Sequence, residues 1–66
     1  MKDIFQLHDV ARIKAGPYAG LVGRITQQLP GVGGGWLMVR IEGVKDGESV
    51  DVEKKFRPSE LERNHG

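Results

Sequence analysis

Apolar and polar residues alternate along much of this chain with the two-residue period of a β-strand. The period is clearest in residues 36–41, where Leu37, Val39 and Ile41 share one face and the residues between them share the other. Similar alternation runs through residues 10–14, 24–29 and 49–53. The pattern predicts an all-β fold built from these strands.

The apolar face of each strand is predicted to form the core. Phe56 is expected to anchor a basic stretch over residues 54–57, and Leu61 is expected to plug the core from a short 3₁₀ turn over residues 58–61. The strand residues expected inside are Ala11, Ile13, Ile25, Leu37, Val39, Ile41, Val50 and Val52, with Leu21 at the mouth.

Glycine and proline mark the connections between these strands. A cluster at residues 16–23 separates the first two strands, and Asp46–Gly47, within a turn over residues 44–48, is a strong hairpin signal. Residues 29–35 hold four glycines and a proline, so we expect a mobile loop with no regular element. This loop is not predicted to bind phosphate as a P-loop, because no Lys-Ser/Thr pair follows it.

The first hairpin resembles a known family. Residues 8–25 read HDVARIKAGPYAGLVGRI, which resembles a KOW motif: an aspartate, an alternating strand, Gly-Pro-aromatic, then Gly-x-x-Gly-x-apolar. His8 departs from the pattern, since glycine is common there. Over roughly residues 8–63 the chain is similar to the C-terminal domain of NusG-type transcription factors and to KOW ribosomal proteins.

The resemblance implies a small five-stranded antiparallel SH3-like barrel of KOW type, with a short 3₁₀ turn before the last strand. On this division residues 8–63 form the barrel. Residues 1–7 form an N-terminal arm or extra strand, and residues 64–66 form a frayed tail.

Charge and composition narrow the function. The net charge is only +1, but residues 1–40 carry five basic and two acidic residues, which allows a modest basic face. The chain has no cysteine, which excludes disulfides and thiolate metal sites and is compatible with the cytoplasm. The chain also lacks a membrane-length apolar stretch and a signal-peptide core, so we expect a cytoplasmic protein. The sequence leaves the oligomeric state open, with a monomer favoured.

Association with RNA or DNA, alone or within a ribonucleoprotein or transcription complex, is the function that the resemblance implies first. Basic side chains would contact phosphates and aromatic rings would stack on bases. Two alternatives stay open: Tyr18 packs on the barrel, and Trp36 covers its open end beside residues 4–5. The candidate nucleic-acid contacts are Lys14, Tyr18, Arg24, Trp36 and Arg40.

Binding of a transcription or ribosomal protein is the second function, and the near-neutral charge favours it. NusG-type domains grip partner proteins with loops at one end of the barrel, and the resemblance carries this role to residues 16–20 and 43–48. The candidate contacts are Gly16, Pro17, Tyr18, Gly20, Lys45 and Asp46.

No catalytic residue, metal site or cofactor is predicted. The two histidines, His8 and His65, are far apart, and no carboxylate cluster has metal-ligand spacing. Type II dihydrofolate reductase is a remote alternative, because it is also a small SH3-like barrel and its end resembles residues 60–64. Its Val-Gln-Ile-Tyr strand is replaced here by residues 50–53, whose Asp51 and Glu53 disfavour the anionic ligands of that enzyme, so we do not expect an enzyme.

Overall fold

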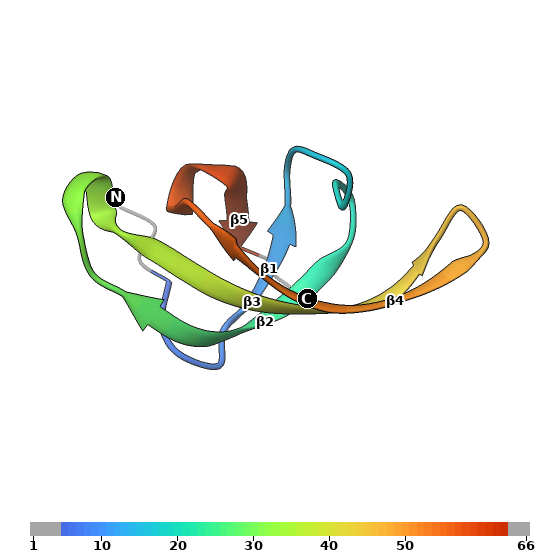
Figure 1. Ribbon diagram of the computed structural model, residues 1–66, viewed down its shortest axis with the longest axis horizontal. Coiled ribbons are helices and arrows are strands. Elements are labelled where there is room, and N and C mark those ends of the chain that lie inside the picture. Colours follow the sequence, from blue (N-terminus) through green and yellow to red (C-terminus); the bar gives the residue numbers. More distant parts are fainter. Residues whose placement is uncertain (1–4, 64–66) are drawn as a thin grey trace.

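The computed structural model describes residues 5–63 of the chain. It contains five strands and two 3₁₀ turns (Figure 1). The elements are β1 (Val10–Ile13), β2 (Val22–Leu29), η1 (Val32–Gly34), β3 (Trp36–Lys45), β4 (Glu48–Phe56), η2 (Pro58–Glu60) and β5 (Leu61–Arg63). The predicted tail at 64–66 and residues 1–4 of the predicted arm lie outside the described residues.

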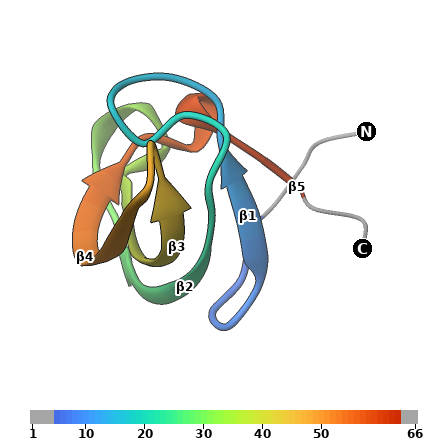
Figure 2. The same ribbon diagram turned by 90° about the vertical axis from the view of Figure 1, so that its right-hand side faces the viewer.

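All five strands belong to one antiparallel sheet with the order β4-β3-β2-β1-β5. The sheet is strongly bent, with β1 and β4 on opposite sides of the curve (Figure 2). The predicted all-β class, the five antiparallel strands and the 3₁₀ turn before the last strand are confirmed. β4 and β5 are the two edges and do not pair with each other in the described part, so closure into a barrel stays a prediction.

The β3–β4 hairpin is longer than the alternation predicts. Strands expected over 36–41 and 49–53 extend to 36–45 and 48–56, and only Asp46 and Gly47 remain in the turn. Both have positive φ, 53° and 80°, as a two-residue type I′ turn requires. The expected turn over residues 44–48 is therefore too wide, because this tight turn lets the strands pair up to Lys45 and Glu48.

The core lies on the concave side of the sheet and matches the predicted set closely. Residues Ala11, Ile13, Ile25, Leu37, Val39, Ile41, Phe56 and Leu61 are buried together, and Leu21, Val50 and Val52 pack against them partly buried. Gly23 lies between Ala11 and Ile41 in the register. A Cβ there would stand 2.6 Å from the Arg40 carbonyl oxygen, so the absence of a side chain permits this close packing.

The described part of the arm, residues 5–7, is held against the sheet without forming a strand. Phe5 is buried in the core, and its carbonyl accepts a 2.8 Å hydrogen bond from Gln28 Nε2. The backbone then turns at His8, whose φ is 75°, a conformation that glycine adopts without strain. The His8 amide donates to the Ile25 carbonyl at 2.8 Å, and the Asp9 carboxylate accepts from the Gln6 amide at 3.0 Å. Asp9 thus closes the turn before β1.

Candidate functional site

Trp36 begins β3 and carries two cations on its ring. The antiparallel register pairs Leu37 with Phe56 and Met38 with Lys55, which brings the end of β4 beside Trp36. The guanidinium carbon of Arg57 lies 4.0 Å from the ring centroid, and the Lys55 ammonium lies 5.1 Å from it. Both distances are within the range of cation–π attraction. Trp36 itself is half-buried, so part of the indole is open to solvent.

Arg57 also tethers the glycine-rich loop, residues 29–35. Its Nη1 donates to the Val32 carbonyl at 2.8 Å and to the Gly35 carbonyl at 3.2 Å. Its backbone amide donates to Glu60 Oε1 at 2.9 Å, which holds the start of η2. A single short 3₁₀ turn, Val32–Gly34, lies within residues 29–35, but Gly33 and Gly34 have φ of 72° and 89°, so no repeating helical conformation forms. Arg57 satisfies carbonyls at both ends of this turn.

A cleft of about 570 Å³ opens beside Trp36. Its walls come from the arm, from the end of β2, from the glycine-rich loop and from η2, and they are mainly apolar. Gln28 supplies the amide in the lining, and its nitrogen is already bonded to the Phe5 carbonyl. The described lining residues are Phe5, Gln28, Leu29, Pro30, Gly34, Trp36, Leu37 and Pro58.

Charge is segregated along the β3–β4 hairpin. The end that carries Trp36 holds Lys54, Lys55 and Arg57, and no acidic residue occurs in segments 27–39 or 54–59. The far half holds the acidic residues Glu42, Asp46, Glu48, Asp51 and Glu53 with only Arg40 and Lys45 to offset them. The glycine-rich loop (green) and the Asp46–Gly47 turn (orange) lie at opposite ends of the molecule (Figure 1). We call Trp36, Lys54, Lys55 and Arg57 the basic end.

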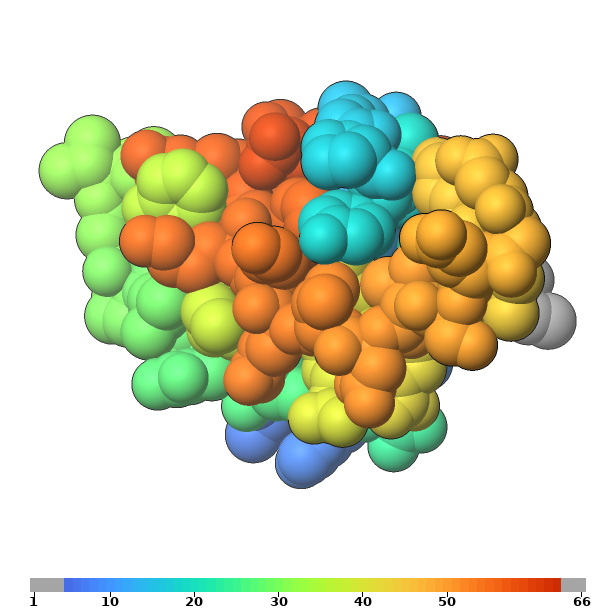
Figure 3. Space-filling model, turned by 45° about the vertical axis from the view of Figure 1, so that its right-hand side comes forward, coloured from blue at the N-terminus to red at the C-terminus, as the bar shows by residue number. Residues whose placement is uncertain are grey.

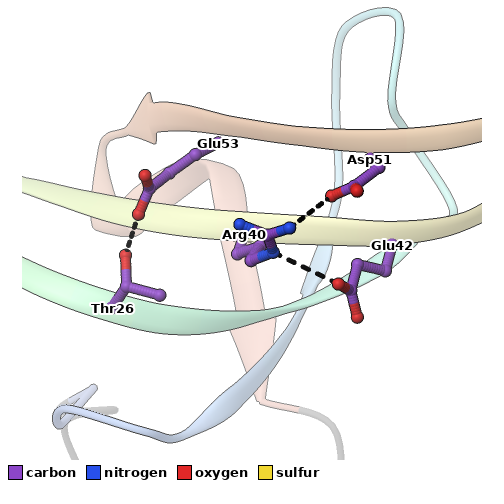
Figure 4. A network of polar contacts seen from close by, with 5 residues as sticks. All are labelled: Thr26, Arg40, Glu42, Asp51 and Glu53. Atoms are coloured by element: carbon purple, nitrogen blue, oxygen red, sulfur yellow. Dashed lines mark hydrogen bonds and ion pairs between the residues drawn. The ribbon is translucent and has the colours of Figure 1, made fainter.

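Arg40, a predicted nucleic-acid contact, is held by carboxylates on the outer face of the sheet (Figure 4). Its guanidinium pairs with Asp51 at 2.8 Å and with Glu42 at 3.2 Å. The hydrogen bond to Glu42 and the charge of Asp51 raise the pKa of Arg40 above its ordinary value. Thr26 is hydrogen-bonded to Glu53 in the same network. These acidic neighbours offset the charge that Arg40 would offer to a phosphate.

The five predicted nucleic-acid contacts lie in three separate places. Arg24 and Arg40 are register partners on β2 and β3. Trp36 is four residues before Arg40, or roughly 13 Å along the strand. Lys14 and Tyr18 belong to the connection between β1 and β2, where Lys14 is exposed and Tyr18 packs against the core partly buried. The sequence pattern therefore does not correspond to one continuous surface.

The two predicted partner-binding loops do lie together. Lys45 Nζ donates to the Ala19 carbonyl at 2.6 Å and so ties the hairpin to the connection that contains Gly16 and Gly20. Figure 3 shows this connection (cyan) beside the hairpin (orange). Gly16 and Gly20 have φ of 89° and 91°, a backbone conformation that glycine adopts without strain. Lys45 is thereby half-buried, while Val44 beside it is 65% exposed.

Comparison with family models, with curated proteins and with solved structures finds no match for this chain. Within residues 5–63, no helix has the length and apolar character needed to cross a membrane. The same described residues contain no group of three or more metal-ligating side chains.

Proposed function

We propose that this protein is a small non-catalytic KOW-type binding module that associates with nucleic acid through its basic end. The observation that carries the proposal is the placement of Lys55 and Arg57 over the ring of a partly exposed tryptophan, within the basic stretch of residues 54–57. Cations neutralise phosphates and release their counterions, while an indole offers a stacking surface to bases.

In this proposal the nucleic-acid surface lies at the Trp36 end of the β3–β4 hairpin, whereas the five contacts predicted from the sequence are spread over three places. Trp36 is kept, and Lys55 and Arg57 replace Arg40 because Arg40 is paired with two carboxylates. The net charge of +1 predicts modest affinity, and the phosphate contacts predict that this affinity falls as salt is added.

The resemblance of residues 8–25 to a KOW motif supports a ribonucleoprotein or transcription complex as the setting. His8 is the position at which the sequence departs from the motif, and its left-handed φ of 75° is the backbone state in which a glycine fits best. The departure at position 8 therefore changes the side chain while keeping a glycine-like backbone.

The test is fluorescence anisotropy of a labelled single-stranded oligonucleotide at low salt, with a matched pair of variants. Lys54→Gln/Lys55→Gln removes two charges at the basic end, and Lys14→Gln/Arg24→Gln removes the same charge elsewhere. We expect the first variant to weaken binding and to reduce the slope of log K against log salt by about 1.4. The second variant should keep the wild-type slope. Absence of binding by the wild type, or equal losses in both variants, overturns the proposal.

A second candidate is a protein-binding surface at the other end of the hairpin. The hydrogen bond from Lys45 to Ala19 joins the two loops into one surface, with Val44 exposed beside it. Asp46 and Glu48 make this surface acidic, so its partner would present a basic segment around an apolar side chain. Protein retained from a nuclease-treated lysate by the wild type, and lost with Val44→Lys, would favour this candidate.

A further inference from the structure

We propose that the cleft beside Trp36 receives a single unstacked nucleobase, so that the protein selects single-stranded nucleic acid over duplex. The inference rests on the proposed function and adds a ligand class to it. It assigns a role to a cavity that phosphate binding at the basic end does not need.

The size and lining of the cleft suit a flat heterocycle. Its volume of about 570 Å³ falls within the roughly 300–1,000 Å³ typical of small-molecule sites. Trp36 provides an aromatic surface, and Leu29, Leu37 and Pro58 provide apolar contacts. The side-chain amide nitrogen of Gln28 is bonded to the Phe5 carbonyl. The amide oxygen of Gln28 therefore remains as a hydrogen-bond acceptor for a donor on the edge of a base.

The charges around the cleft indicate what such a heterocycle is attached to. Lys55 and Arg57 lie over the ring that lines the cleft, and Lys54 precedes Lys55 on the edge strand β4. An isolated apolar ligand would gain nothing from these cations, whereas a base carries phosphates on both sides of its sugar. Charge complementarity therefore favours a nucleotide within a strand as the occupant of the cleft.

Base pairing opposes this mode of binding. A base within a duplex is stacked and paired on both sides, and its extraction into a pocket costs free energy that a single strand does not pay. Stacking of one base on an aromatic side chain contributes a factor of about 5 to 150 in affinity. We expect at least this lower factor between a single strand and a duplex of equal length.

Trp36 is the only tryptophan of the chain, so its fluorescence reports directly on the cleft. The experiment titrates the wild-type protein at low salt with three probes of equal length: a single-stranded oligonucleotide, an abasic strand with the same sugar-phosphate backbone, and a duplex. We expect the single strand to bind best and to quench Trp36. The abasic strand should bind at least fivefold more weakly and leave the emission nearly unchanged.

The outcomes separate the two proposals. Equal affinity for the single strand and the abasic strand, without quenching, overturns the base site and leaves phosphate binding at the basic end intact. Equal affinity for duplex and single strand also overturns it. Failure of all three probes to bind removes the proposed function itself. Trp36→Leu should lose the preference for bases while keeping affinity for the abasic strand, and Met38→Leu, outside the cleft lining, should keep both.

Discussion

Replacement of Gly23 by alanine tests the packing on which the whole sheet depends. Gly23 is buried in β2, with Ala11 and Ile41 as its register partners. An added Cβ would stand 2.6 Å from the Arg40 carbonyl oxygen and 2.6 Å from Val39 Cγ1. The first contact is backbone within the β2–β3 ladder and the second belongs to a fully buried side chain, so neither can move away cheaply.

The expected cost follows from the size of this clash. Overpacking a tight core by a methyl group costs about 1–3 kcal/mol, and sometimes more. A 66-residue domain has a total stability of roughly 3–10 kcal/mol, so Gly23→Ala should remove a large fraction of it. In a domain of this size each kcal/mol lowers Tm by about 4–8 °C, which predicts a decrease of roughly 4–24 °C.

Thermal and urea unfolding followed by circular dichroism measure the effect, with Gly43→Ala as the matched control. Gly43 is also a strand glycine, in β3, but a Cβ there makes only an ordinary 3.6 Å contact with Leu21 Cδ2. We expect this control to unfold within a few degrees of the wild type. If Gly23→Ala were as stable as Gly43→Ala, the close approach of β2 and β3 at this point would be refuted.

Three further substitutions test individual contacts. Arg57→Met keeps the aliphatic stem but removes the donors to Val32 and Gly35, so we expect a loss of about 1–3 kcal/mol and faster amide exchange over residues 31–35; unchanged exchange would argue against the tether. Lys45→Met removes the hydrogen bond to Ala19 and should cost about 1 kcal/mol, measured by urea unfolding, and no loss at all would contradict this role. Arg40→Gln breaks two exposed ion pairs, so stability should change by less than about 1 kcal/mol and oligonucleotide affinity should stay at the wild-type value; a large loss of affinity would restore Arg40 as a contact.

The inward residues of the sheet were predictable because strand alternation has an exact period of two. The burial of Ile25 and Val39 could be predicted from their positions in alternating runs alone, and both side chains are fully buried. The ends of the strands were harder to predict. Val44 and Lys45 continue β3 without apolar alternation, because pairing with β4 across the tight turn determines their conformation. The burial of Phe5 was harder still to predict, because residues 5–7 form no strand, so no strand period marks their inward side chains.

The basic end was missed because its members are far apart in sequence. Residues 54–57 read as a solvated charged edge when taken alone, and the role of Arg57 depends on carbonyls of the glycine-rich loop. One signal was present: the Asp46–Gly47 turn fixes the hairpin register, and counting back along both strands places Arg57 opposite Trp36. The pairing of Arg40 with Glu42 and Asp51 follows from the same register, in which Glu42 lies opposite Asp51.

Amide chemical-shift mapping with a single-stranded oligonucleotide tests the central claim most directly. The account predicts that the shifts concentrate in residues 28–37 and 54–58, around Trp36 and its cleft, and that they weaken as salt is added. Shifts confined to residues 14–20 and 44–48, or no shifts at low salt, would contradict it.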